Sequence, residues 1–232
     1  MQRGVCLVTQ PPPRSESELL LRAEALSGIS LGELASSLEV PLPRTLKHHK
    51  GVVGDLIEAA LGATASSLPK PDFLDLGIEL KTIPLSSTGS PRESTHVCTV
   101  PMKQSSPALW QTSTVRAKLK RVLWMPIDAA HEKTLPERRL GRAFLWSPSP
   151  EDEAILRTDW EELMELITFG QFERISARLG RHLQIRPKAA NGRSLVASHD
   201  ADGAPTESLP LGFYLRQRFT ARILRQQEFV DG

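Results

Sequence analysis

Apolar residues recur every three or four positions in several stretches of the chain, which is the spacing of one helix face. The first stretch runs to Leu26, and either Ser15 or Ser17 can cap its beginning. Ser30 and Glu33 have the spacing of a capping box for the next helix. The periodicity predicts helices over residues 15–26, 30–38, 42–46, 51–62, 150–169, 171–179 and 219–229.

Shorter apolar runs that end at proline, glycine or polar residues are typical of strands. Residues 115–128 predict one strand whose start shows a basic face, because Lys118 and Lys120 alternate with Leu119. Its second half, from Val122 to Trp124, is apolar enough to enter the core. The remaining strands are predicted over residues 77–84, 95–101, 143–146, 182–187 and 211–215.

The order of these elements indicates the fold class. Strands and helices are mixed without strict alternation, so the predicted fold is α/β (mixed α+β), a mixed β-sheet flanked by helices rather than a doubly wound sheet. Residues 1–14, which contain three consecutive prolines, predict a flexible N-terminal arm. Residues 198–208 are polar and predict a mobile loop.

The composition limits the classes of protein to which the chain can belong. Its 232 residues carry a net charge of only +2, so nucleic-acid binding would need a local basic patch. Cys6 and Cys98 are far apart and form no CxxC motif, which excludes a disulfide scaffold and a zinc ribbon. No apolar run approaches the roughly 18 residues of a membrane span, and no signal peptide is visible. We therefore expect a cytoplasmic protein.

The stretch from Asp72 to Lys81 carries the strongest candidate chemistry. In a strand, Glu79 and Lys81 would point to the same side, and a turn before the strand would bring Asp72 back beside Glu79. Carboxylate oxygens suit Mg²⁺, and a nearby ammonium can orient an attacking water. The alternative is a solvated charged face, because a short Glu-x-Lys motif often has no function.

Glu58 lies beside the apolar stripe of the helix predicted for residues 51–62. Two interpretations are equally open from its position alone. It is either a carboxylate on the helix surface or a further acidic group that faces Asp72 and Glu79.

Several motifs, taken together in order and spacing, resemble the MutH family of mismatch-repair nicking endonucleases, which is related to type II restriction endonucleases. The resemblance covers nearly the whole chain, from about residue 19 to residue 229. It rests on KGVVG at 50–54, Glu58, DF at 72–73, LGIELKTIP at 76–84, KLKRVLW at 118–124, DWEELM at 159–164, GQ at 170–171, QIRPKAAN at 184–191 and GFYL at 212–215.

The resemblance implies a fold and a catalytic site. The fold would be the restriction-endonuclease-like core, with residues 15–232 forming a single endonuclease domain of two lobes around a DNA cleft. The catalytic pattern of the family, Asp-(x)₆-Glu-x-Lys, falls on Asp72, Glu79 and Lys81, and Glu58 matches a further acidic residue. Asp72, Glu79 and the Leu80 carbonyl would be the Mg²⁺ ligands.

The resemblance also implies DNA contacts. Lys118 matches a basic residue near the scissile phosphate, and Tyr214 matches an aromatic residue that senses unmethylated adenine. His96 departs from the family, in which we expect an apolar aromatic residue. The other implied DNA-binding residues are Lys50, Gly51, Glu93, Arg186, Pro187 and Lys188.

The activity implied by the resemblance is Mg²⁺-dependent nicking of the unmethylated strand at hemimethylated GATC sites. The protein would act as a monomer on double-stranded DNA, stimulated by MutL and indirectly by MutS. Two alternatives are a stand-alone GATC restriction enzyme and a non-catalytic DNA-binding module. The single Asp-(x)₆-Glu-x-Lys pattern without an internal repeat favours nicking over cutting both strands, and its completeness favours catalysis over binding alone.

Overall fold

The computed structural model describes residues 10–43, 51–65, 68–102, 109–176, 178–188, 195–199 and 204–231. The chain divides into two compact units. The first unit comprises Met1–Glu93 and Arg121–Ser147, and the second comprises Ser94–Lys120 and Pro148–Gly232. Lys50 and most of the helix predicted for residues 42–46 lie outside the described residues.

Capping residues set an end of each of three helices in the first unit. Helix α1 (Glu16–Ala25) begins at Ser15, whose hydroxyl accepts from the Glu18 N–H, which decides between the two predicted caps. Helix α2 (Leu31–Ser37) has the predicted capping box of Ser30 and Glu33. Helix α3 (Val52–Leu61) ends at Gly62, which adopts the left-handed conformation.

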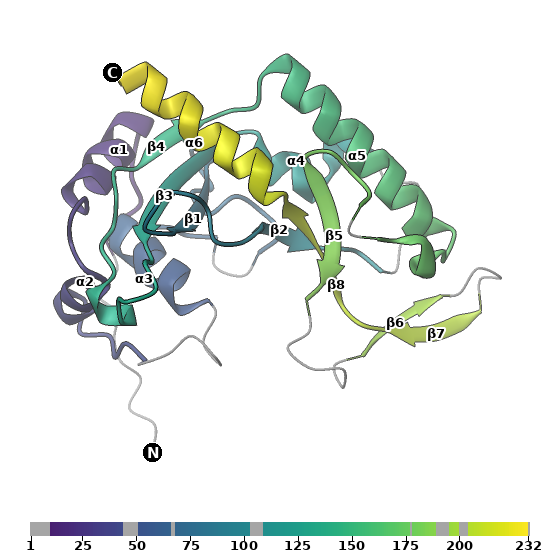
Figure 1. Ribbon diagram of the computed structural model, residues 1–232, viewed down its shortest axis with the longest axis horizontal. Helices are drawn as coiled ribbons and strands as arrows, with labels where there is room; N and C mark the ends of the chain where they lie inside the picture. The colour runs from purple at the N-terminus through teal and green to yellow at the C-terminus, as the bar shows by residue number, and fades with distance from the viewer. Residues whose placement is uncertain are drawn as a thin grey trace. The chain divides into compact units, whose positions relative to one another are not determined.

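The sheet of the first unit is mixed, as predicted. Strand β1 (Glu79–Leu85) pairs in parallel with β3 (Val122–Asp128), which pairs antiparallel with β4 (Phe144–Trp146). Helix α3 packs against β1 and also contacts α1 and α2 (Figure 1). One apolar core joins these elements, with fully buried Leu19, Ile57, Ile78 and Leu123 among its members. A 3₁₀ turn, η2 (Leu135–Glu137), packs against α2.

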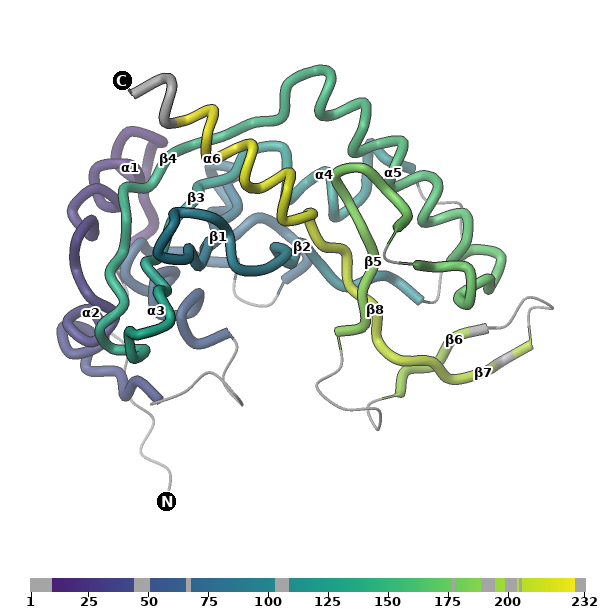
Figure 2. Tube along the Cα trace, viewed as in Figure 1, coloured from purple at the N-terminus to yellow at the C-terminus, as the bar shows by residue number. Residues whose placement is uncertain are grey.

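The second unit is built on an antiparallel sheet. Strand β8 (Leu211–Leu215) lies between β2 (Thr95–Thr99) and β5 (Leu183–Pro187). Helix α5 (Pro150–Thr168) packs against β5, and the chain ends in α6 (Gln217–Asp231). Strands β6 (Val196–His199) and β7 (Pro205–Ser208) form an antiparallel ribbon that precedes β8 (Figure 2). These elements confirm the α/β fold class of mixed strands and helices.

Residues 115–121 correct one prediction, because they do not form the start of a strand. Residues Thr114–Leu119 form helix α4, and β3 begins only at Val122. The Ser113 hydroxyl caps this helix by accepting from the Arg116 N–H, and Val115 and Leu119 are buried one turn apart. Lys118 therefore lies on a helix and not on a basic strand face.

Two other predictions were wrong. Among the described residues, the helix predicted for residues 171–179 is reduced to a single 3₁₀ turn, η3 (Phe172–Arg174), which follows the end of α5 at Thr168 and Gly170 with its positive φ. The described part of the loop predicted for residues 198–208 contains the end of β6 and all of β7, because backbone pairing satisfies these polar segments. A further 3₁₀ turn, η1 (Trp110–Thr112), precedes α4.

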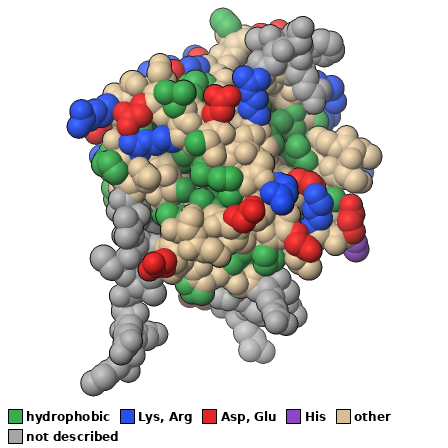
Figure 3. All heavy atoms as spheres, turned by 90° about the vertical axis from the view of Figure 1, so that its left-hand side faces the viewer, with side chains coloured by type: hydrophobic (Ala, Val, Ile, Leu, Met, Phe, Trp, Pro, Cys, Tyr) green, Lys and Arg blue, Asp and Glu red, His purple; other side chains and the backbone are tan. Residues whose placement is uncertain are grey.

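The surface of the first unit carries both signs of charge. Figure 3 shows the face where α1 and α2 lie, with acidic, basic and hydrophobic side chains interspersed. This mixture agrees with the small net charge of +2. Among the residues described, no helix combines the length and apolar character needed to cross a membrane.

Candidate active site

A tight turn brings Asp72 to the beginning of β1, as the sequence predicts. Phe73 and Ile78 bridge each other on the two sides of the turn, and Gly77 supplies a φ of 65° that other residues rarely adopt. The Asp72 Oδ2 atom accepts a hydrogen bond of 2.8 Å from the Leu80 N–H. Asp72 is therefore held at the strand start, although it lies seven residues before Glu79 in the sequence.

Glu79 and Lys81 form a buried ion pair on one side of β1. The Lys81 ammonium donates to Glu79 Oε1, and the two side chains are only 11% and 2% exposed. The Glu79 N–H donates to the Arg121 carbonyl at 3.0 Å, which fixes the backbone at this point. This arrangement rules out the alternative of a solvated charged face, because the pair is withdrawn from water.

Glu58 belongs to the same cluster and not to the open helix surface. Burial raises the pKa of the Glu58 carboxyl to about 7, with further raising by the charges of Asp72, Asp55 and Glu79 and an opposing effect of Lys81. Helix α3 carries this side chain to β1 because its apolar face packs on the shared core. The structure therefore favours the interpretation of Glu58 as a further acidic group beside Asp72 and Glu79.

Asp55 is a member of this electrostatic cluster that the sequence analysis missed. It lies one turn before Glu58 on α3, and its charge contributes to the raised pKa of Glu58. The signal was present in the sequence, because residues three apart on a helix are neighbours on its surface. Two acids at that spacing in an otherwise apolar helix mark a concentration of negative charge.

The donor set fits a hard divalent cation that keeps part of its water shell. Asp72 and Glu79 supply carboxylates that are 5% and 2% exposed, and the crowding of negative charge raises the pKa of Glu58. Within the described residues, no group of three or more His, Cys, Asp or Glu side chains is arranged to hold a metal ion by itself. A cation bound by Asp72, Glu79 and the Leu80 carbonyl would thus take its remaining ligands from water or substrate, as Mg²⁺ commonly does.

The DNA-contact candidates outside β5 and β8 are found on different elements. Gly51 precedes α3 and is exposed, and its carbonyl accepts from the Asp55 N–H at 3.0 Å. Glu93 is exposed at the end of the first segment of the first unit. Lys118 is half-buried on α4 in the second unit.

The remaining candidates gather at one end of the antiparallel sheet in the second unit. Arg186 pairs with Gly212 across β5 and β8, and Pro187 pairs with Leu211. Lys188 continues the pairing through its N–H to the Pro210 carbonyl at 2.7 Å, and its ammonium donates to Thr99 on β2 at 2.8 Å. Three exposed residues in a row, from Arg186 to Lys188, therefore extend from a rigid strand.

Tyr214 lies on the central strand of that sheet. It pairs with His96 on β2 and with Gln184 on β5. The rings of His96 and Tyr214 meet edge to face, with centroids 5.1 Å apart. His96 therefore takes an aromatic packing position despite its departure from the expected apolar residue.

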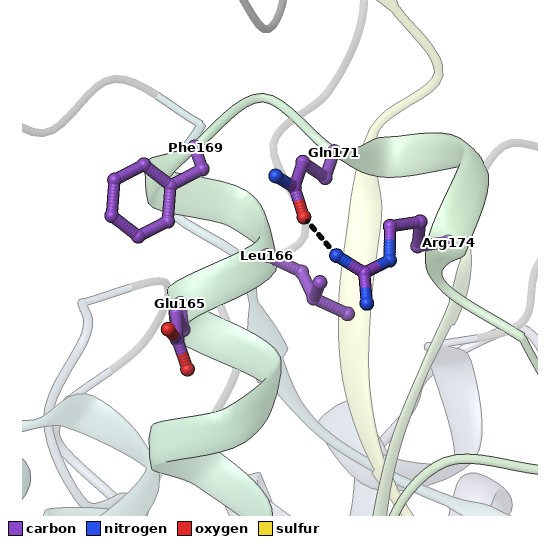
Figure 4. Close-up of a pocket in the computed structure, with 5 residues that line it drawn as sticks. All are labelled: Glu165, Leu166, Phe169, Gln171 and Arg174. Carbon is purple, nitrogen blue, oxygen red and sulfur yellow. Dashed lines mark hydrogen bonds between the residues drawn. The ribbon is translucent and has the colours of Figure 1, made fainter.

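The second unit has a surface hollow at the end of α5. It has a volume of about 320 Å³ and is formed by Glu165, Leu166, Phe169, Gln171 and Arg174 at the end of α5 (Figure 4). The Arg174 guanidinium donates to the Gln171 side chain at 2.6 Å across the hollow. Its lining contains none of the catalytic or DNA-binding candidates.

Comparison with known proteins identifies one family. Residues 61–159 match the family model described as "DNA mismatch repair enzyme MutH". Over 216 residues, 93% of the chain, the sequence is 50% identical to the DNA mismatch repair protein MutH of Vibrio vulnificus, of which it covers 95%. The relative of the same name from Serratia proteamaculans is 50% identical over 220 residues, 95% of the chain and 96% of the relative. A Salmonella paratyphi B relative is 52% identical over 213 residues, 92% of each chain.

Proposed function

Because the chain belongs to the MutH family of DNA mismatch repair enzymes, we propose that it nicks the unmethylated strand at hemimethylated GATC sites by Mg²⁺-dependent hydrolysis. Membership of the family makes the protein an endonuclease of DNA mismatch repair. The observation that carries the finer proposal is the convergence of Asp72, Glu79 and Lys81 at the start of β1. Their types and spacing suit metal-assisted attack of water on a phosphodiester.

In this proposal, Asp72, Glu79 and the Leu80 carbonyl hold the cation. When bound, Mg²⁺ would polarise the phosphoryl oxygen and stabilise the charge that develops on it. The fixed orientation of Asp72 by the Leu80 N–H and of Glu79 by Lys81 prepares these ligands before DNA binds. Preorganised groups contribute more to catalysis than groups that must move during the reaction.

Lys81 and Glu58 are the groups that can handle the water and its proton. The Lys81 ammonium is held by Glu79 and can donate a hydrogen bond to a water or phosphate oxygen beside it. The Glu58 carboxyl has a pKa of about 7, so near neutral pH it can exist in either protonation state and accept a proton. Lys81 would thus position the attacking water, and the ionised Glu58 carboxylate would take up its proton.

Strand discrimination is proposed for the second unit. Arg186, Pro187 and Lys188 would contact bases and phosphates from the end of β5, and Tyr214 would pack against the adenine edge. A methyl group on adenine N6 removes one donor and adds bulk in the major groove. The edge-to-face contact with His96 supports the Tyr214 ring, so that the ring would be held in place against such a base edge.

A stand-alone restriction enzyme is the second candidate. Such an enzyme would cut both strands and would need two active sites, from a dimer or an internal repeat. The chain has one Asp-(x)₆-Glu-x-Lys pattern and no internal repeat, which favours nicking by a monomer.

We also propose a cytoplasmic location and stimulation by MutL after MutS has detected a mismatch.

Strand-resolved cleavage of short GATC duplexes tests the proposal. Unmethylated, hemimethylated and fully methylated duplexes would be incubated with Mg²⁺, with and without MutL, and a chelator would serve as the control. The expected result is a nick in unmethylated strands only, dependent on Mg²⁺ and faster with MutL. Concerted cleavage of both strands without MutL would favour the restriction enzyme, and binding without cleavage would favour the DNA-binding module.

A further inference from the structure

Arg121 makes hydrogen bonds to three segments of the first unit, and one of these segments contains Glu79 of the candidate active site. Its backbone carbonyl accepts from the Glu79 N–H at 3.0 Å. Its Nε and Nη2 atoms donate to the two carboxylate oxygens of Glu16 at 3.0 and 2.6 Å. Its Nη1 atom lies 3.4 Å from the Ser147 hydroxyl.

The geometry of the Glu16–Arg121 pair constrains direction as well as distance. Two parallel N–H···O bonds form between the planar guanidinium and the carboxylate, so neither group can rotate without breaking one of them. Glu16 is the first residue of α1, whose N-terminus is fixed by the Ser15 cap. The Glu16–Arg121 ion pair, called the lock below, therefore connects the beginning of α1 to the residue before β3.

The position of this lock along the chain is informative. The chain enters the second segment of the first unit at Arg121 and leaves it at Ser147. Arg121 thus anchors both ends of that segment through its own backbone and through the Ser147 hydroxyl. The residue whose carbonyl holds Glu79 is therefore itself held by side-chain hydrogen bonds to Glu16 and Ser147.

We propose that Arg121 is a positioning residue for the metal site, acting through its carbonyl on Glu79 while Glu16 holds its side chain. Rotation of the Arg121 peptide would move the Glu79 backbone and change the direction of the Glu79 carboxylate. This inference rests on the proposed function and adds to it a residue that touches neither metal nor DNA. Loss of the Glu16–Arg121 ion pair should therefore lower the affinity for Mg²⁺ more than the free energy of unfolding, because exposed ion pairs contribute little to protein stability.

The chain offers a matched control at the other end of β3. Lys133 pairs with Asp128, the last residue of the strand, and their side chains are 35% and 41% exposed. The corresponding values for Arg121 and Glu16 are 33% and 45%. The two ion pairs thus have similar exposure and flank the same strand, but only one of them adjoins Glu79.

The test compares Arg121→Lys and Glu16→Gln with Lys133→Gln. Arg121→Lys keeps the positive charge but cannot form the bidentate hydrogen bonds with Glu16. Glu16→Gln keeps the shape of the side chain but removes its negative charge. Mg²⁺ affinity would be measured by calorimetry without DNA, together with thermal unfolding and the Mg²⁺ dependence of nicking. Partners that orient metal ligands typically change affinity by about 10- to 100-fold when lost. We expect a weakening of at least about fivefold in both lock variants, with unfolding temperatures close to that of Lys133→Gln.

Each outcome has a defined meaning. If the lock variants bind Mg²⁺ and nick DNA as Lys133→Gln does, the positioning role is overturned while the proposed function stands. If they lose activity only in proportion to a loss of folded protein, their role is structural and the inference is also overturned. If the wild-type protein neither binds Mg²⁺ nor nicks DNA, the proposed function fails and the inference fails with it.

Discussion

Two clusters of buried carboxylates in this chain are alike in burial but differ in what surrounds them. Asp72 and Glu79 in the first unit are 5% and 2% exposed, and Asp152 and Asp159 in the second are 5% and 3% exposed. Asp159 accepts backbone hydrogen bonds from Arg181, His182 and Leu183 at 2.6–2.8 Å. Asp159 therefore has the bonding of a structural acid, which orders the approach to β5.

The buried negative charge of Asp152 is balanced by a cationic side chain instead of backbone donors. It pairs with Arg222 on α6 and lies 3.3 Å from His182 Nε2, and the His182 ring stacks on Phe219. Burial lowers the pKa of His182 below its usual range, with the charge of Arg222 acting in the same direction. In the second unit, each buried acid is thus matched by donors or by a cation.

The first unit instead concentrates negative charge. Burial raises the pKa of Glu58 most, the charges of Asp72, Asp55 and Glu79 raise it further, and the charge of Lys81 opposes them only in part. The comparison teaches that burial of a carboxylate does not by itself mark a reactive site. The distinguishing feature is the crowding of several carboxylates around one ammonium, which a divalent cation would relieve.

Among the variants that separate the two clusters, the largest expected effect is a decrease of nicking in Lys81→Ala. Removing the ammonium leaves Glu79 buried without its cation and removes the group proposed to orient the water. A preorganised contact of this kind is worth about 10²- to 10³-fold in rate, so we expect a decrease of that order with DNA binding nearly unchanged. Single-turnover nicking and a binding titration measure the two effects. Lys133→Ala is the control, and a Lys81→Ala rate equal to that control would exclude Lys81 from catalysis.

Asp159→Asn should break the second cluster with a different signature. Three buried N–H donors would lose a charged acceptor, which costs roughly 3 kcal/mol in the free energy of unfolding. Chemical denaturation measures this change, and nicking per folded molecule should be retained. A stable variant with lost nicking would instead assign Asp159 to the chemistry and invalidate the comparison between the two clusters.

Glu58→Gln should change the pH dependence of stability in metal-free protein. The folded-state pKa of about 7 lies above the usual glutamate value of 4.5, so the stability that the protonated carboxyl contributes is fully present below pH 4.5. That contribution is lost as the pH rises through 7. We therefore expect Glu58→Gln to be more stable than wild type at pH 8.5 by roughly 1–2 kcal/mol, with the difference vanishing near pH 4.5.

Denaturant unfolding in the presence of a chelator measures the Glu58 effect. The matched control is Glu24→Gln, a change of an exposed acid on α1, which should follow wild type across this range. A constant difference between Glu58→Gln and wild type at all pH values would show that the Glu58 carboxyl does not titrate near pH 7.

Tyr214→Ala has the smallest expected effect and concerns the choice of strand. Removing the ring should reduce the preference for hemimethylated over fully methylated DNA, by about tenfold if one close contact of roughly 1.4 kcal/mol is lost. Tyr214→Phe keeps the ring and serves as the control. Competition between the two duplexes measures the preference, and an unchanged ratio in Tyr214→Ala would place the methyl sensor elsewhere.

The parts of the fold that the sequence predicted depend on short-range chemistry. The Ser15 and Ser30 caps, the Gly62 stop and the turn between Asp72 and Glu79 each involve residues fewer than ten positions apart. Local hydrogen bonds and backbone conformation are sufficient to specify such features. Because this turn is local, the proximity of Asp72 to Glu79 could be predicted from the sequence alone.

The missed features depend on distant partners or on ambiguous spacing. Residues 114–119 satisfy both a helical and an alternating pattern, and only the Ser113 cap favours the helix. The β6–β7 ribbon is stabilised by pairing between polar strands, which leaves no apolar signal. The Asp152–Arg222 and Glu16–Arg121 pairs join residues 70 and 105 positions apart, and no local rule connects them.

Nicking by Asp72→Ala tests the central claim most directly. The variant and the wild-type protein would be compared on a hemimethylated GATC duplex with Mg²⁺, and DNA affinity would be measured in the same buffer with Ca²⁺. The account predicts that the variant binds DNA with near wild-type affinity and produces no detectable nick. Nicking at the wild-type rate would contradict the assignment of Asp72, Glu79 and Lys81 as the active site.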